Sequence, residues 1–195
     1  MKNFIPVCEP LLAGNELQYV NDAVSTGWIS SSGKYVEAFE KAFASYCGAH
    51  YGIAVCNGTV ALHLMLVAAG IRKGDEVIIP TFTMAASAFA ICYIGALPVF
   101  VDADKDTWNI DASKIEEKIT KKTKAIMPVH IFGNPCNVPV ISKTAQKHNL
   151  LVLDDAAEAH GAEYNGVKTG MLADMTAFSF FANKNITTGE GGMVV

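Results

Sequence analysis

The residues best suited to chemistry follow three short apolar segments of the chain. Asn57-Gly58-Thr59 follows YGIAVC, Asp154-Asp155 closes LLVLDD, and Ser179 and Lys184 lie in TAFSFFANK. Short apolar segments bounded by turn residues predict buried strands. Ligands of parallel α/β sheets bind at the carboxyl ends of the strands, so these polar groups are the candidates for a site.

The turn Asn57-Gly58-Thr59 leads directly into a predicted helix, VALHLMLVAAG. A glycine turn at a helix start exposes free backbone N–H groups and the positive end of the helix dipole, which together suit a phosphate. The Thr59 hydroxyl would add a donor. An ordinary Asn-Gly turn with a threonine cap is the alternative, because the segment is neither a P-loop nor a GxGxxG fingerprint.

Asp154 and Asp155 are carboxylates at the end of an apolar strand, where burial is costly without a compensating partner. A protonated heterocyclic nitrogen, a metal ion or a helix N-terminus would each supply one. Capping of the next helix explains one aspartate but not both. Magnesium bound with Glu158 is a second alternative, but no further ligand cluster is visible, and we expect no metal site.

Lys184 follows the apolar residues Phe178, Phe180 and Phe181 and precedes the turn-forming run TTGEGG. A surface lysine is the ordinary explanation, but these neighbours favour partial burial. Partial burial favours the neutral amine, which is the nucleophile that condenses with a carbonyl group.

The five histidines are dispersed and have no metal-ligand spacing, so we expect surface or satisfied core residues. Only His130, at a strand end in MPVHIFG, has a position of interest. No GxSxG elbow or HExxH motif is present, so hydrolase templates have no support.

A phosphate cradle, a strand-end aspartate and a later lysine are together complementary to pyridoxal 5′-phosphate (PLP). This cofactor needs a lysine for its aldehyde, an aspartate for its pyridine nitrogen and N–H donors for its phosphate. A Rossmann-type nucleotide-binding module, with Asn57-Gly58-Thr59 on a pyrophosphate, is an alternative from another class, but it lacks its glycine fingerprint.

The surrounding pattern predicts an α/β fold with a mostly parallel sheet and helices on both faces. Two amphipathic helices, at 13–25 and around 36–46, form a helical arm over residues 1–50. From 51 to 195, apolar strands alternate with helices at 59–69, 82–94, 112–120 and 138–148. Residues 51–195 are therefore the predicted cofactor-binding domain.

Composition excludes several classes of protein. Fifteen basic and nineteen acidic residues give a net charge of −4 with no long run of one sign, so neither nucleic acid nor an anionic membrane is an expected partner. No apolar stretch suggests export or a membrane span. Five scattered cysteines predict reduced core residues and a cytoplasmic protein.

Long blocks of the chain resemble the DegT/StrS family of sugar-nucleotide aminotransferases. They include GWISSSGKYV, NGTVALHL, GDEVIIPTFT, LDDAAEAHGA and SFFANKNITTGEGGMV. The likeness covers essentially the whole chain and is greatest to the perosamine synthases of that family. It implies the large domain of PLP-transferase fold type I, and family members continue beyond residue 195 into a smaller C-terminal domain.

The resemblance also implies roles for individual residues. Lys184 matches the lysine that bonds to the cofactor and shuttles the proton, and Asp155 matches the partner of the pyridine nitrogen. Glu158 matches a position beside the cofactor's hydroxyl group. Relatives often place an aromatic residue against the ring where this chain has Met84, so either Met84 or the nearby Phe82 is the expected ring contact. The matched phosphate contacts are Gly58, Thr59 and Ser179.

Membership would imply transfer of an amino group from L-glutamate to a nucleotide-linked 4-keto-6-deoxy sugar, for surface polysaccharide or O-antigen synthesis. It would also imply a homodimer with active sites at the subunit interface. A sugar dehydratase of the same family, in which a histidine replaces the lysine, is disfavoured by Lys184. An inactive fragment of such an enzyme is the remaining alternative.

Overall fold

A seven-stranded sheet forms the centre of the computed structural model, which describes residues 4–6 and 8–195. Among the seven strands of this sheet, only β9 runs against the others, so the sheet is mostly parallel, as predicted. The strands, in their order across the sheet, are β1 (Ile53–Val55), β9 (Gly192–Val194), β8 (Met175–Ser179), β5 (Leu151–Asp155), β4 (Thr123–Ile126), β2 (Glu76–Pro80) and β3 (Leu97–Val101).

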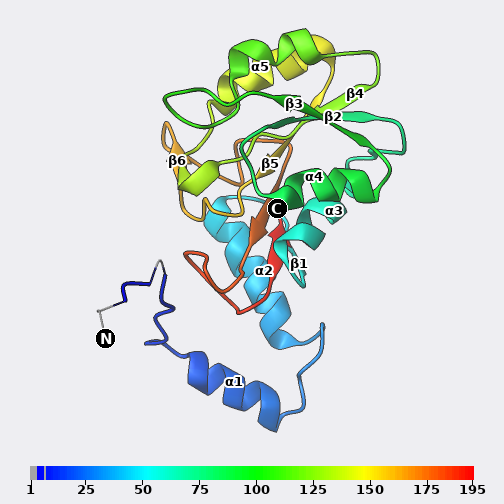
Figure 1. Ribbon diagram of the computed structural model, residues 1–195. Coiled ribbons are helices and arrows are strands. Elements are labelled where there is room, and N and C mark those ends of the chain that lie inside the picture. The colour runs from blue at the N-terminus through cyan, green and yellow to red at the C-terminus, as the bar shows by residue number, and fades with distance from the viewer. Residues whose placement is uncertain (1–3, 7) are drawn as a thin grey trace.

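Helices cover both faces of this sheet (Figure 1). Helices α3 (Gly58–Ala68) and α4 (Ala85–Tyr93) pack on one face, and α2 (Lys34–Cys47) and α5 (Val138–His148) pack on the other. A separate two-stranded hairpin consists of β6 (Glu163–Tyr164) and β7 (Val167–Lys168). The α/β class and the two-faced covering therefore agree with the sequence pattern.

Strand β2 shows why the strands read as uninterrupted apolar runs. Val77 and Ile79 lie in the cluster with α3 and α4, whereas Ile78 lies in the cluster with α5. All three side chains are fully buried. Successive strand residues point to opposite faces, so a strand covered on both faces must be apolar at every position. Each such side chain contributes about 1.5–3 kcal/mol by its burial.

The two N-terminal helices differ in how they contact the rest of the protein. Helix α1 (Glu16–Ser25) has no buried residue, and it extends away from the sheet (Figure 1). Helix α2 instead buries Phe43, whose ring meets those of Phe178 and Phe180 edge-on at centroid distances of 4.9 and 5.1 Å. The division at residue 50 into arm and domain stays a prediction.

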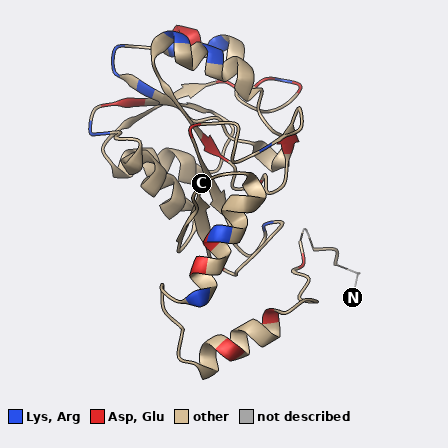
Figure 2. Ribbon diagram, turned by 180° about the vertical axis from the view of Figure 1, so that it is seen from behind, with Lys and Arg blue, Asp and Glu red and all other residues tan. Residues whose placement is uncertain are grey.

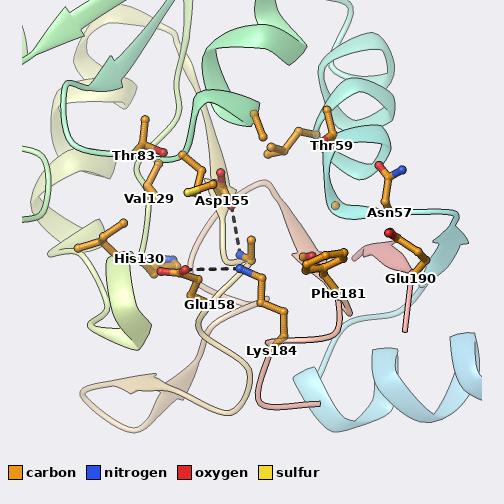
Figure 3. Close-up of a pocket in the computed structure, with 17 residues that line it drawn as sticks. Asn57, Thr59, Thr83, Val129, His130, Asp155, Glu158, Phe181, Lys184 and Glu190 are labelled. Carbon is orange, nitrogen blue, oxygen red and sulfur yellow. Dashed lines mark hydrogen bonds and ion pairs between the residues drawn. The ribbon is translucent and has the colours of Figure 1, made fainter. Parts of the chain in front are cut away.

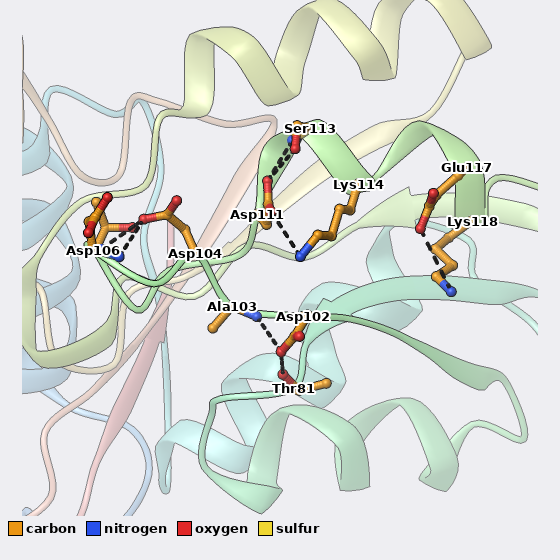
Figure 4. Close-up of polar contacts among 11 residues, drawn as sticks. Thr81, Asp102, Ala103, Asp104, Asp106, Asp111, Ser113, Lys114, Glu117 and Lys118 are labelled. Carbon is orange, nitrogen blue, oxygen red and sulfur yellow. Dashed lines mark hydrogen bonds and ion pairs between the residues drawn. The ribbon is translucent and has the colours of Figure 1, made fainter.

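The helix predicted at 112–120 is wrong. Two short 3₁₀ turns occupy this region, η1 (Ala112–Lys114) and η2 (Glu116–Lys118). The Asp111 carboxylate accepts hydrogen bonds from both the N–H and the hydroxyl of Ser113, which caps the first turn (Figure 4). Ile115 is the only residue of 112–118 that is fully buried, so there is no apolar stripe to hold a longer helix against the sheet.

Charged side chains of both signs are interspersed over the described chain. Along α2, Lys34 and Lys41 flank Glu37 and Glu40, and Figure 2 shows residues of both signs along the ribbon. No helix in the described residues is both long and apolar enough to cross a bilayer.

The cysteines of the described chain are all unpaired. Cys47 and Cys136 are buried, as predicted for core residues, but Cys8, Cys56 and Cys92 are exposed. The prediction of core positions was therefore wrong for three of the five. Cys56 directly follows β1, and Cys92 lies in the last turn of α4, where an apolar neighbourhood in sequence does not ensure burial.

Candidate active site

A cavity of about 330 Å³ lies at the carboxyl edge of the parallel strands. Its lining includes residues that follow β1, β2, β4, β5 and β8, far apart in the chain. In Figure 3, Asn57 and Thr59 lie on one side, His130 and Glu158 on the other, and Asp155 and Lys184 between them. All seven residues predicted for the site line this cavity: Gly58, Thr59, Met84, Asp155, Glu158, Ser179 and Lys184.

The start of α3 presents unused donors to the cavity. Asn57 caps the helix, and its side chain accepts a hydrogen bond from the Val60 N–H at 3.0 Å. The N–H groups of Gly58 and Thr59 have no acceptor among the described residues. These groups and the helix dipole form an anion-binding end.

Gly58 is required by a close approach to β8. A Cβ atom at this position would lie 2.6 Å from Cβ of Ser179 and 3.0 Å from its hydroxyl oxygen. Because contacts this short do not occur between ordinary side chains, only glycine lets the helix start reach Ser179. The hydroxyls of Thr59 and Ser179 thereby line the same cavity as the free N–H groups.

Asp155 ends β5 and is 4 % exposed. Its Oδ2 accepts a hydrogen bond from the Ser87 hydroxyl at 2.7 Å, and its Oδ1 accepts one from the Ala157 N–H at 3.1 Å. Burial raises the pKa of this carboxyl above its ordinary value, although these two hydrogen bonds act in the opposite direction. A cation bound at Asp155 would compensate the burial.

Asp154 lies on the other side of β5 and does not reach the cavity. Its Oδ2 is 3.0 Å from Nε2 of His130, and both side chains are fully buried. The two aspartates diverge because neighbouring strand residues point to opposite faces. No cluster of three metal-binding side chains occurs in the described part of the chain, and the Asp154–Asp155–Glu158 grouping considered for magnesium does not form.

Lys184 lies in the turn after β8 and is mostly buried, with 13 % of its side chain exposed. Its Nζ is 3.4 Å from Oε1 of Glu158, and the other Glu158 oxygen accepts a hydrogen bond from the Phe132 N–H at 2.8 Å. Phe132 belongs to the turn η3 (Ile131–Gly133) and has a left-handed backbone, with φ 50°. Glu158 therefore joins the lysine to this turn.

Met84, rather than Phe82, is the residue at the cavity wall. Met84 precedes α4, lines the cavity and is 65 % exposed. The Phe82 ring instead packs beside Trp108, at a centroid distance of 5.2 Å, in a neighbouring hollow. Of the two candidates for a ring contact, Met84 therefore lines the cavity and Phe82 does not.

Several polar groups near the site were missed by sequence reasoning. Ser87 holds Asp155, and Thr83 is 2.7 Å from Ser87; because the Ser87 proton goes to Asp155, Thr83 must be the donor to Ser87. Their spacing of four residues at the start of a helix was the available signal. The expectation of satisfied core histidines holds for His130 but fails for His160, whose buried ring nitrogens have no partner among the described residues.

Comparison with known proteins gives close relatives. The chain is 57% identical over 190 residues to GDP-perosamine synthase of Caulobacter vibrioides, a match that covers 97% of this chain and 51% of the relative. The chain therefore spans about half the length of the curated relatives it matches.

Solved structures resemble the fold closely. An aminotransferase from Psychrobacter cryohalolentis matches with a TM-score of 0.89 and 39% identity, covering 96% of this chain and 49% of that one. An E. coli GDP-4-keto-6-deoxy-D-mannose-3-dehydratase with bound hydrated PLP matches with a TM-score of 0.91 and 31% identity, covering 97% and 50%. Residues 10–195 match the family pattern itself, and the chain belongs to the DegT/DnrJ/EryC1/StrS aminotransferase family.

Proposed function

We propose that this chain supplies the cofactor-binding half of a PLP-dependent aminotransferase that acts on a nucleotide-linked sugar. The amino donor is L-glutamate and the acceptor is a 4-keto-6-deoxy sugar, as in a perosamine synthase. Family membership and the identity to a GDP-perosamine synthase support this assignment. The role in surface polysaccharide or O-antigen synthesis follows from the same analogy.

The cavity residues fit PLP. Asp155 is a buried carboxylate whose two hydrogen bonds both come from neutral groups, so a protonated ring nitrogen would complete its environment. The free N–H groups of Gly58 and Thr59 open a cradle that a Cβ on Gly58 would fill. A cavity of about 330 Å³ is within the range of small-molecule sites.

The residues divide the work of binding and proton transfer. Gly58, Thr59 and Ser179 would bind the phosphate, Met84 would cover one face of the ring, and Asp155 would keep its nitrogen protonated. When bound, the cofactor supplies an electron sink for the carbon that loses its proton. Nζ of Lys184 is the amine that would hold the aldehyde and then carry the proton, with Glu158 beside it.

The convergence of Lys184, Asp155 and the start of α3 on one cavity is the single observation that carries the proposal. Addition of PLP should produce a visible absorption band. Borohydride reduction followed by peptide mass spectrometry should then find a pyridoxyl group on Lys184. Lys184→Ala should abolish the adduct, whereas the control Lys143→Ala, at an exposed position on α5, should retain it.

A modified peptide that lacks Lys184 would contradict the assignment. PLP that binds without a reducible linkage would favour the dehydratase alternative, in which the cofactor is not attached to lysine. Turnover with the nucleotide sugar and L-glutamate is to be measured on the full-length protein, because this chain covers about half of its relatives. Turnover by the isolated chain would exclude the inactive-fragment alternative.

We further propose a homodimer in the full-length protein and a cytoplasmic location. Apolar side chains of α1 are exposed without contacts to the sheet: Leu17 at 74 %, Val20 at 59 % and Val24 at 64 %. A second subunit would cover this face. Sedimentation of the full-length protein should give a dimer, and Leu17→Glu should weaken it. The unpaired cysteines suit a reducing compartment.

A further inference from the structure

The buried pair His130–Asp154 has no part in the mechanism described so far, although His130 lines the cavity and Asp154 lies behind it. Asp154 precedes Asp155 on β5, and the His130 backbone N–H donates to the Asp155 carbonyl oxygen at 3.0 Å. Neither side chain of the pair is exposed. A fully buried charge without a clear partner is costly, so the protonation state of this pair is of interest.

Two hydrogen bonds define the state of the His130 ring. Nδ1 accepts a hydrogen bond from the Cys136 N–H at 3.0 Å, and Nε2 is 3.0 Å from Oδ2 of Asp154. An accepting Nδ1 has no proton, so the proton must be on Nε2, from where it is donated to Asp154. A flipped ring would turn carbon atoms toward both partners.

The charges around His130 favour a second proton on its ring, but the hydrogen-bond geometry opposes one. Burial lowers the pKa of His130, but the contacts with Asp154 and Cys136 together outweigh burial and raise the pKa to about 10. A proton on Nδ1 would, however, set two N–H donors against each other at 3.0 Å. The ring can be charged only if the turn at Cys136 opens, so the folded protein has the neutral tautomer.

A neutral imidazole leaves the pair with the charge of Asp154. Protonated Asp154 would need an acceptor for its own O–H group, but Oδ2 already accepts from His130 and Oδ1 has no partner among the described residues. The described residues also place no lysine or arginine on Asp154. Among the described residues, no cation on the Asp154 side of β5 therefore compensates the buried negative charge of Asp154.

We propose that His130 and Asp154 are positioning residues whose retained negative charge stabilises a protonated ring nitrogen at Asp155 across the strand. This inference depends on the proposed function, because the cation that it concerns belongs to PLP. His130 holds Asp154 in place without neutralising it, which a lysine or arginine could not do. The role differs from that of Asp155, which would touch the ring.

Asp154→Asn tests the proposal, because asparagine keeps an acceptor oxygen for His130 and removes the charge. We expect the affinity for PLP to fall by about tenfold, which corresponds to 1.4 kcal/mol. Affinity for 1-deazapyridoxal 5′-phosphate, which lacks the ring nitrogen, should change by less than about twofold. A merely structural role would weaken both ligands equally, and that result would overturn the proposal.

Asp174→Asn is the matched control, because Asp174 accepts a hydrogen bond from the Val152 N–H near the opposite end of β5. Its charge is removed with the acceptor retained, and both affinities should stay unchanged. If Asp154→Asn and Asp174→Asn changed the ratio of the affinities for PLP and the deaza analogue equally, the effect would not be local to Asp154. Failure of the wild type to bind PLP would instead refute the proposed function.

A second measurement needs no variant and no cofactor. The ¹⁵N spectrum of labelled imidazole rings should show His130 as the neutral Nε2–H form from pH 6 to 9. Assignment uses His130→Gln, which removes its signals. An imidazolium at neutral pH would give the pair no net charge and would overturn the proposal even if Asp154→Asn failed to fold.

Discussion

The hydrogen bond between Ser87 and Asp155 gives a prediction whose size follows from its surroundings. Ser87 is fully buried, and its hydroxyl is 2.7 Å from Oδ2 of Asp155. Ser87→Ala removes the oxygen, leaves almost no change in volume, and deprives Thr83 of its acceptor. A hydrogen bond to a charged group contributes about 1.5–3 kcal/mol, so the free energy of unfolding should fall by that amount at pH 7.

The pH dependence of this loss has a definite sign. Burial raises the pKa of Asp155 in the folded protein, so the contribution of this group to stability is full at low pH and is lost as pH rises through that pKa. Ser87 lowers the pKa, and Ser87→Ala should therefore raise it further. The stability difference between wild type and variant should be largest at neutral pH and shrink to about 1 kcal/mol once Asp155 is protonated.

Urea unfolding of both proteins at several pH values measures this difference, and the melting temperature should fall by roughly 3–12 °C at pH 7. The control is Ser113→Ala, which removes a similar bond of 2.6 Å to Asp111 in an exposed turn (Figure 4). Water replaces that bond, so little change is expected. Equal effects at the two serines, or a loss that grows as the pH falls, would refute the reasoning.

Two further predictions concern Gly58 and His160. Gly58→Ala would bring a Cβ within 2.6 Å of Cβ of Ser179, so the start of α3 must shift. We expect this overpacking to destabilise the fold by about 1–3 kcal/mol and to lower the affinity for PLP, measured by titration, at least about tenfold. The control Gly14→Ala should change little, because its Cβ meets only a flexible side chain. Burial lowers the pKa of His160 to about 4 from 6.5, so its contribution is present above pH 6.5 and is lost as pH falls toward 4, by up to about 3 kcal/mol. His160→Phe should remove that pH dependence from urea unfolding curves, and parallel curves for variant and wild type would contradict it.

The strands and the site edge were predictable because their signals are local. The segment EVIIP coincides with β2, Glu76–Pro80, since burial on both faces demands apolar residues at all four positions after Glu76. Parallel strands end at one edge, so residues that follow different strands meet there whatever their separation in the chain. Gly58, Asp155 and Lys184 converge for this reason.

The partners of these residues were not predictable in the same way. Whether Ser87 faces Asp155 depends on the rotation of α4 about its axis, which tertiary packing sets and a sequence of small apolar residues does not reveal. The pairing of His130 with Asp154 depends on the turn at Cys136. The opposite directions of Asp154 and Asp155, however, follow from strand geometry alone, and the magnesium alternative could have been rejected on that ground.

The Lys184–Glu158 pair explains how one cavity can contain an amine, a carboxylate and an anion-binding helix end without collapse. The amine and the carboxylate both have partners: Glu158 pairs with Lys184, and Ser87 and Ala157 donate to Asp155. The Lys184–Glu158 ion pair is 3.4 Å long and partly exposed, so it contributes about 0–1 kcal/mol to stability. Breaking this ion pair when the amine bonds to an aldehyde would therefore cost little free energy. Glu158 remains bonded to the Phe132 N–H after such an exchange, so its carboxylate would stay in place beside the reacting nitrogen.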